Sequence, residues 1–483
     1  MPGLFVRAKV RFCMELSRKH YRLAMGLILV LAFAVRAGAA VWWQQRLGDT
    51  PFAFGDSLSY WTMTRNLVTD GDFQYGSTES RMFRVPGYPL ALAPLFLIGG
   101  PEPPVLAARL LGAALGTAAV AGVGSVARQL FTPAIGLVAA AGATLYPGAI
   151  GMSVFVLSEA LFCPLMVLHL GLWIAAWRRQ TAGDRATCSR PAREETANDE
   201  SDAGGRSVPA AIRWALASGV VAGLATLTRP SWLLFLPFAA VVLLVVSPRR
   251  GEHARLLLAI CVGFAVAMSP WWIRNAAITG RFVPTTLQIG ATLYDSFHPG
   301  ATGGSDSNME FVPGFIDAQL AADRASLAAG QTPPSTFEYR LDRRMRDAAI
   351  AWAAANPAEV VRLVGRKSWR VWSPLPNAAE MRSGLMRWAI AAGYLPILAL
   401  GIVGGWRFRR RGWAYLACAM PTLYTAALHT AFVGSIRYRQ PAMLMLIVLA
   451  SAVAVELIGP AWRRTRGGGR LAFSDRKEPA CDA

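Results

Sequence analysis

A succession of long apolar runs restricts the fold of this chain more than any other feature. A helix that crosses the hydrocarbon core of a bilayer needs about 20 predominantly apolar residues, and most of these runs reach or approach that length. Hydrophobic residues make up 54% of the sequence and charged residues only 16%. We therefore predict an all-α polytopic membrane protein. The runs cover residues 23–43, 88–99, 105–127, 134–150, 157–177, 212–227, 232–246, 254–273, 384–403, 413–433 and 442–458.

The run at 88–99 differs from the others, because it is short and is interrupted by Pro89 and Pro94. Runs of about 10–14 residues are more often re-entrant or interfacial than membrane-spanning. Clusters of arginine and lysine favour the cytoplasmic side, and they all lie on that side only if 88–99 does not cross. We predict about ten transmembrane helices and two cytoplasmic termini. The clusters lie within residues 7–19, 178–179, 249–250, 407–411 and 463–464.

This topology divides the chain into regions with different surroundings. The transmembrane catalytic module contains the first external loop and a polar cytoplasmic linker, and we expect the linker and the C-terminal tail to be disordered because they are polar and Gly-rich. The regions are a cytoplasmic N-terminus (1–22), the module (23–274) with its external loop (44–87) and linker (180–207), a second external loop (275–383), C-terminal transmembrane helices (384–460) and a cytoplasmic tail (461–483).

The second external loop is predicted to contain two helices. Residues 335–338 read Ser-Thr-Phe-Glu, a capping box that could begin a helix ending near Ala355. Residues 357–372 alternate apolar and basic positions at helical spacing. Such a helix either lies at the membrane interface or packs on the outer face of the membrane domain, and the sequence does not choose between the two.

The net charge of +20 comes mainly from arginine beside apolar runs, which favours a membrane protein over a nucleic-acid-binding protein. This charge suits anionic lipid headgroups or a phosphate-bearing substrate. The six cysteines and five histidines show neither a disulfide framework nor a metal-binding spacing. The sequence therefore argues against a zinc enzyme.

Two acidic residues stand at the predicted external ends of helices. Asp56 follows the first span in the stretch Phe-Gly-Asp-Ser-Leu-Ser-Tyr-Trp, where it could simply cap a helix at 57–69. Its loop, however, is rich in carboxylates and ends in the rigid turn Arg84-Val-Pro-Gly-Tyr-Pro89, as expected for the rim of a site. Glu159 lies at the end of a span, where ionisable residues are functional candidates.

Arginines gather on the same predicted side, at positions 229, 274, 437 and 439. Each could extend to lipid headgroups on its own. Together with the acids they indicate a bound anion, because arginine binds phosphate in a bidentate manner. The combination predicts group transfer from a phosphate-linked lipid, with Asp56 as the general base and the guanidinium groups stabilising the leaving phosphate.

The sequence resembles the GT-C class of integral-membrane glycosyltransferases, in particular the bacterial branch related to protein O-mannosyltransferases and to the lipid A aminoarabinose transferase. The resemblance covers most of residues 23–450, and the order of the motifs carries it. The motifs are Asp56-Ser-Leu-Ser-Tyr60, Asn66-Leu with Gly71-Asp-Phe73, Arg84-Val-Pro-Gly-Tyr-Pro89, Leu157-Ser-Glu159, Arg229-Pro230, Pro270-Trp-Trp-Ile-Arg-Asn275 and Arg437-Tyr-Arg-Gln-Pro441.

This resemblance implies an inverting glycosyltransferase that uses a polyprenyl-phosphate-linked sugar. Asp56 carries over as the main catalytic acid and Glu159 as a second one, for acceptor positioning or a metal. Phe83-Arg84 replaces a Glu–Lys pair of some relatives, and Ser57 replaces a second acid. These departures leave open whether the protein uses no cofactor or a divalent cation, Mg²⁺ or Mn²⁺. The expected substrate-binding residues are Tyr60, Arg84, Tyr88, Arg229, Arg274, Asn275, Arg437, Tyr438 and Arg439.

The resemblance also implies a location in the bacterial inner membrane with the active site on the periplasmic side. The expected partners are the lipid-linked donor, a lipid, glycan or protein acceptor, and membrane lipids, but no nucleic acid. A lipid-linked polysaccharide ligase or polymerase is an alternative, although it would not need the motif at Asp56. A transporter or flippase is another, yet ionisable residues within spans are sparse, chiefly Arg36 and His169.

Overall fold

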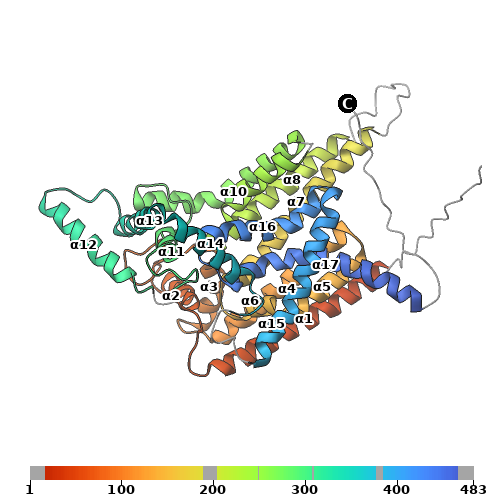
Figure 1. Cartoon of the computed structure of the whole chain (residues 1–483), viewed down its shortest axis with the longest axis horizontal. Helices are drawn as coiled ribbons and strands as arrows, with labels where there is room; N and C mark the ends of the chain where they lie inside the picture. The colour runs from red at the N-terminus through yellow and green to blue at the C-terminus, as the bar shows by residue number, and fades with distance from the viewer. Residues whose placement is uncertain (1–16, 189–203, 248–249, 307–308, 377–383, 466–483) are drawn as a thin grey trace, which may run out of the picture.

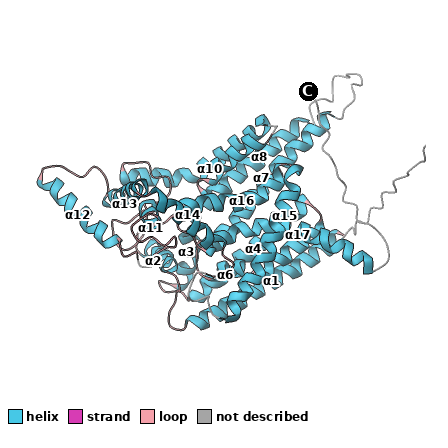
Figure 2. Ribbon diagram, in the orientation of Figure 1, coloured by secondary structure: helices cyan, strands magenta, loops and turns pink. Residues whose placement is uncertain are grey.

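The computed structural model describes residues 17–188, 204–247, 250–306, 309–376 and 384–465, and within them the chain is helical and contains no strand (Figures 1 and 2). The predicted all-α architecture is confirmed. Most of the predicted linker and tail, and residues 1–16 of the N-terminus, lie outside the described residues. The helices on either side of the linker extend further than expected, because residues 180–188 and 204–207 are helical.

The helices run along the chain as follows. The first part contains α1 (Arg18–Leu47), α2 (Gly55–Thr69), α3 (Gly87–Gly99), α4 (Val105–Leu130), α5 (Pro133–Leu145), α6 (Pro147–Val154), α7 (Glu159–Cys188), α8 (Gly204–Thr228), η1 (Pro230–Trp232), α9 (Phe235–Val246) and α10 (Arg250–Thr279). The second part contains α11 (Ile289–Ser296), α12 (Val312–Ala328), α13 (Phe337–Ala355), α14 (Pro357–Trp372), α15 (Gly384–Phe408), η3 (Arg409–Arg411), α16 (Trp413–Ala431) and α17 (Ile436–Thr465).

Seven described helices are long and apolar enough to cross a membrane, namely α1, α4, α7, α8, α10, α15 and α17. The bent pair α5 and α6 would make an eighth. The other two predicted spans form helices of a different kind: α9 is short, and α16 is long enough but less apolar. The segment at 88–99 forms α3, which has 13 residues and is also short. The chain is a multi-pass membrane protein.

The predicted span at 134–150 is interrupted at Tyr146, where the axis turns by 58° between α5 and α6. Pro147 starts the second helix and cannot donate a backbone hydrogen bond to the turn before it. Arg36 of α1, which is fully buried, donates hydrogen bonds to the carbonyls of Ala143 (3.0 Å) and Thr144 (3.4 Å) at the broken end. The mid-span arginine therefore satisfies backbone groups that the bend exposes.

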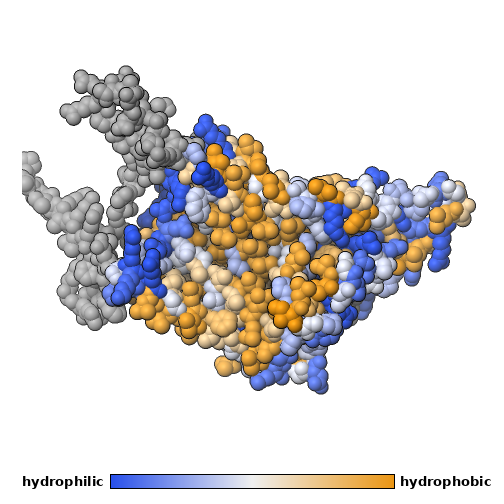
Figure 3. Space-filling view, turned by 180° about the vertical axis from the view of Figure 1, so that it is seen from behind, coloured by the Kyte–Doolittle hydropathy of each residue, from blue (hydrophilic) through white to orange (hydrophobic). Residues whose placement is uncertain are grey.

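The centre of the bundle is α17, in which every residue from 439 to 453 is buried. By contrast, only 17% of the most apolar 18-residue stretch of α1 is buried, whereas 72% of the corresponding stretch of α17 is buried. Exposed apolar side chains such as Leu27 and Val30 cover the outside of α1. Figure 3 shows a band of hydrophobic residues across the middle of the molecule, with hydrophilic residues at both ends. This band is what a bilayer would cover.

Helices α2, α3 and α11–α14 lie together at one end of the bundle, and α12 projects from it (Figure 1). Helix α13 confirms the predicted helix up to Ala355, but its N-cap is Thr336, one residue later than the predicted Ser335. Glu338 therefore does not complete a capping box. Its carboxylate instead accepts hydrogen bonds from the backbone N–H groups of Arg81 and Met82.

The amphipathic helix α14 is confirmed, and its buried side packs on α16 and α17. Leu363, Lys367 and Val371 are buried there, and the Lys367 ammonium donates to the last carbonyl of α16, that of Ala431, at 3.1 Å. Val361 and Trp369 lie on another face and are about 70% exposed. One face thus packs on the membrane domain, and the opposite face is apolar enough to contact lipid.

Candidate active site

Asp56 lies in the first turn of α2 and does not cap it, which corrects the simpler interpretation of this residue. The N-cap is Phe54, and it makes no side-chain capping bond. The neighbouring serines fix the turn: the Ser57 hydroxyl donates to the carbonyl of Phe155 at 2.9 Å, and the Ser59 hydroxyl donates to the carbonyl of Asp56 at 2.8 Å. The carboxylate is therefore free to face the end of the bundle instead of its own helix.

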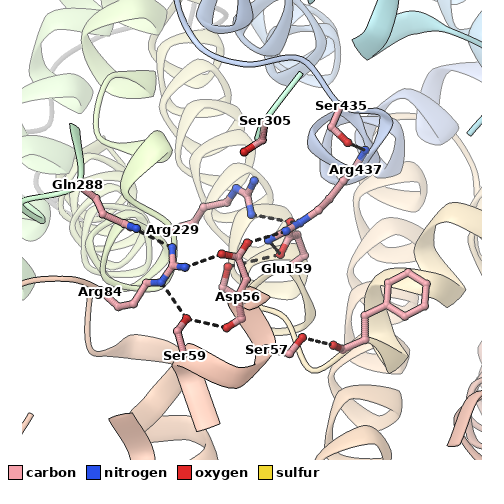
Figure 4. Close-up of polar contacts among 12 residues, drawn as sticks. Asp56, Ser57, Ser59, Arg84, Glu159, Arg229, Gln288, Ser305, Ser435 and Arg437 are labelled. Carbon is pink, nitrogen blue, oxygen red and sulfur yellow. Dashed lines mark hydrogen bonds and ion pairs between the residues drawn. The ribbon is translucent and has the colours of Figure 1, made fainter. Parts of the chain in front are cut away.

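Both oxygens of the Asp56 carboxylate accept hydrogen bonds from arginines (Figure 4). Arg84, in the loop before α3, contacts Oδ1 at 2.5 Å. Arg437, at the start of α17, contacts Oδ2 at 2.7 Å. Arg84 also donates to the Ser59 hydroxyl at 3.2 Å and to Gln288 Oε1 at 3.0 Å. Three segments that are distant in sequence thus meet at this one carboxylate.

Glu159 begins α7 directly after the turn that ends α6, and its side chain is fully buried. Arg229 forms an ion pair with Oε1 at 2.7 Å, and Arg437 donates to both oxygens, to Oε2 at 3.2 Å. Val156 in the turn has φ of 53°, a backbone conformation that β-branched residues rarely adopt. This strained turn aims Glu159 back toward the same arginine that holds Asp56.

Aromatic rings surround the guanidinium groups. Arg84 lies over Tyr60, with 5.1 Å from its central carbon to the ring centroid, and Arg229 lies over Tyr438 at 5.3 Å. The His429 ring stacks on the Tyr438 ring, with 4.6 Å between the two centroids. Tyr88 is buried and packs edge-on against Tyr60. Tyr60 and Tyr438 therefore contact the arginines, whereas Tyr88 supports Tyr60 from behind.

Three of the expected substrate-binding residues lie apart from this cluster. Arg274 donates to the carbonyl of Arg81 at 3.3 Å and lies over Trp271. The Asn275 amide donates to the carbonyls of Val283 and Thr285, which fixes the chain after α10. Arg439 is buried and donates to the carbonyls of Val371 and Ser373 at the end of α14. These contacts stabilise the fold around the site.

Ser59, Gln288 and His429 join the cluster without having been predicted. The Gln288 amide reaches Arg84 from 204 positions away in the chain, and no motif marks it. His429 lies in the last turn of α16, eight residues before Arg437, and its Nδ1 lies 2.7 Å from the carbonyl of Val433. Of these three residues, only Ser59 lies within one of the sequence motifs, at a variable position of Asp56-Ser-Leu-Ser-Tyr60.

The cluster carries more positive than negative charge, because three guanidinium groups face two carboxylates. Burial alone would raise the pKa of Asp56, but Arg84 and Arg437 outweigh it and hold the pKa well below its usual range. Asp56 is therefore ionised at neutral pH. An excess positive charge is suited to binding an anionic ligand, and the ionised carboxylate beside it is suited to accepting a proton from a hydroxyl group.

The donor set does not fit a divalent cation. Within the described ranges, no group of three or more His, Cys, Asp or Glu side chains is placed to hold a metal. Asp56 and Glu159 offer only two carboxylates, and their oxygens accept hydrogen bonds from guanidinium groups. Mg²⁺ and Mn²⁺ require several oxygen ligands around one point.

The fold is similar to that of solved membrane glycosyltransferases, in agreement with the resemblance to the GT-C class noted in the sequence. It is similar to the oligosaccharyltransferase of Archaeoglobus fulgidus tethered to an acceptor peptide, with a TM-score of 0.54 and 14% identity over 93% of this chain and 51% of that one. For the archaeal oligosaccharyltransferase AglB from the same organism, in complex with an inhibitory peptide and a dolichol-phosphate, the TM-score is 0.51 and the identity is 14%, over 94% of this chain and 52% of that one.

ArnT from Cupriavidus metallidurans in the apo state is more distant, with a TM-score of 0.39 and 15% identity over 93% of this chain and 80% of that one. No family model matches the sequence, and no curated protein matches it. The chain spans about half the length of the oligosaccharyltransferase. The relationship thus rests on the shared fold.

Proposed function

We propose that the protein is an inverting glycosyltransferase that moves a sugar from a polyprenyl-phosphate-linked donor to an acceptor hydroxyl on the outer face of the membrane. The observation that carries the proposal is the Asp56 carboxylate held between Arg84 and Arg437 at one end of a GT-C bundle. A solved structure with a similar fold contains a dolichol-phosphate, which supports a lipid-phosphate ligand here.

The donor phosphate is proposed to bind the guanidinium groups of Arg84, Arg229 and Arg437. All three now donate to Asp56 or Glu159. A phosphate group competes for the same N–H groups, since charge-assisted bonds to phosphate are as strong as those to carboxylate. Donor binding would therefore loosen the hold of the arginines on Asp56 and raise its basicity. The base would become active when the donor is in place.

In the transfer step, Asp56 takes the proton from the acceptor hydroxyl. The acceptor oxygen forms a bond to the anomeric carbon of the sugar, while the bond from that carbon to the phosphate oxygen breaks. The electron pair of that bond leaves with the lipid phosphate, and the arginines stabilise its increasing negative charge. Attack opposite to the leaving group inverts the anomeric centre. No general acid is required, because the phosphate is a good leaving group.

Glu159 is proposed to position Arg229 and Arg437 rather than to bind a metal. Its carboxylate contacts both guanidinium groups from a fully buried position. A buried carboxylate with two arginine partners fixes the planes of the two guanidinium groups, which bidentate phosphate binding requires.

The proposed location of the active site is the periplasmic side of a bacterial inner membrane.

The test is transfer from labelled polyprenyl-phosphate sugars in membranes that contain the wild type or Asp56→Asn. Loss of the general base should lower the rate about 10²- to 10⁴-fold. Asp49→Asn is the matched control, because Asp49 is exposed in the same loop. It should keep the wild-type rate. Full activity of Asp56→Asn, or consumption of no donor by the wild type across a broad panel, would contradict the proposal.

A further inference from the structure

We propose that Glu338 is a positioning residue: through it, the second external region (residues 275–383) holds Arg84 in position. The inference rests on the proposed role of Arg84 in binding the donor phosphate. Glu338 lies on α13, whereas Arg84 lies in the first external loop. Their link is the backbone of residues 81 and 82, immediately before Phe83 and Arg84.

The Glu338 carboxylate binds this backbone at several points. The N–H of Arg81 donates to Oε2 at 3.0 Å, and the N–H of Met82 lies 3.2 Å from Oε1 and 3.1 Å from Oε2. The Ser80 hydroxyl adds a longer contact of 3.5 Å. The carboxylate thus fixes the path of the main chain rather than any one side chain of the loop.

An apolar contact holds the same point from the other side. The Met82 side chain is 1% exposed and packs against Val283 and Leu287 after α10. The N–H of Leu287 donates to the carbonyl of Met82 at 3.0 Å. Met82 is therefore bound through its N–H, its carbonyl and its side chain, all by residues of the second external region. Such a residue has little freedom to move, and neither has Arg84 two positions later.

One turn further along α13, Asp342 performs a parallel role. Its Oδ1 accepts a hydrogen bond from the N–H of Gly290 at 2.7 Å, at the start of α11. The residue before α11 is Gln288, whose side-chain oxygen accepts from Arg84 at 3.0 Å (Figure 4). Helix α13 consequently fixes both the loop that carries Arg84 and the amide that contacts it.

Among the described residues, the hydrogen-bond partners of Glu338 are backbone N–H groups and one hydroxyl. A buried carboxylate bound in this way acts as a hydrogen-bond acceptor for a loop. Replacing it with an amide places an NH₂ donor against the Met82 N–H in either orientation of the amide, because that N–H lies near both oxygens. The loop should then move, and Arg84 with it.

The experiment measures binding of a polyprenyl phosphate to the detergent-solubilised protein by the ligand concentration that half-saturates the thermal shift. Glu338→Gln should raise that concentration about tenfold or more, the range expected when a buried N–H loses a good acceptor. Glu359→Gln is the matched control and should bind like the wild type, because Glu359 is a partly exposed residue of α14 that pairs with Arg362. Asp342→Asn should weaken binding in the same direction through Gln288.

A double-mutant cycle separates positioning from a general structural role. If Glu338 acts through Arg84, adding Glu338→Gln to Arg84→Gln should change binding no further. An additive loss, or wild-type binding by both Glu338→Gln and Asp342→Asn, overturns the inference. Because binding is measured without turnover, a protein that binds polyprenyl phosphate through Arg84 but transfers no sugar would refute the proposed function and leave this inference intact.

Discussion

At the scale of single residues, buried arginines in this protein have two kinds of partner. Arg36, Arg109 and Arg439 donate to main-chain carbonyls at helix ends, such as that of Val154 at 2.7 Å from Arg109. Arg84, Arg229 and Arg437 donate to carboxylates. Arginines with carbonyl partners satisfy the backbone at helix ends, whereas carboxylate partners can be exchanged for a phosphate.

Arg437 and Arg439 allow a direct test of this distinction, because they are two residues apart on α17. Arg437→Lys keeps the charge but loses the bidentate geometry, so transfer should fall about 10-fold or more with an unchanged melting temperature. Arg439→Lys cannot reach two carbonyls in the same way and should lower the free energy of unfolding by about 1–3 kcal/mol. Transfer assays and thermal unfolding of both variants measure this; equal melting temperatures would contradict it.

The sequence allowed the prediction of four members of the charged cluster, because each is a charged residue beside an apolar run on one predicted side: Asp56, Glu159, Arg229 and Arg437. The fifth, Arg84, was expected from the resemblance to the GT-C class. The sequence could not separate them from Arg439, since the partner of each arginine is distant in the chain. Asn275 illustrates the same limit. Its partners, the carbonyls of Val283 and Thr285, come within reach only because the chain turns back at Gly280.

At the scale of elements, helix positions were predictable from apolar periodicity, and helix interruptions less so. Pro147 inside the run at 134–150 was visible, yet a proline can bend a helix or simply start one. The structure shows a break because Arg36 is available to bind the free carbonyls. The capping box at 335–338 failed for a related reason: Glu338 has stronger partners in another loop than its own helix offers.

Helices α8 and α10 pack at backbone distance through glycines. A Cβ on Gly263 would lie 2.2 Å from the carbonyl oxygen of Leu216, and one on Gly219 would lie 2.0 Å from that of Ile260. Gly263→Ala should therefore push the helices apart and cost about 1–3 kcal/mol of stability. Gly38→Ala in α1, with nothing within 4 Å, should be neutral or slightly stabilising. Thermal unfolding in detergent compares them, and similar values would contradict the packing argument.

At the scale of the whole molecule, the ends of the bundle differ in what they contain. The charged cluster and α11–α14 lie at one end, and the arginines of η3 lie between α15 and α16. Positive charge favours the cytoplasmic side, so we expect the cluster to be external. In a background without native cysteines, Ala329→Cys should react with an impermeant maleimide on intact cells, and Arg410→Cys only after permeabilisation. The reverse labelling would invert the proposed orientation.

The burial of α17 connects the maturation of the protein to its activity. The other described helices precede α17 in the chain, so during synthesis they are made before the segment that fills their common interior. Arg437 arrives with that segment, and it meets Asp56 across 381 positions. A chain in which α17 has not yet been made therefore lacks both its innermost helix and the contact of Arg437 with Asp56, so the charged cluster assembles only after α17 has entered the bilayer.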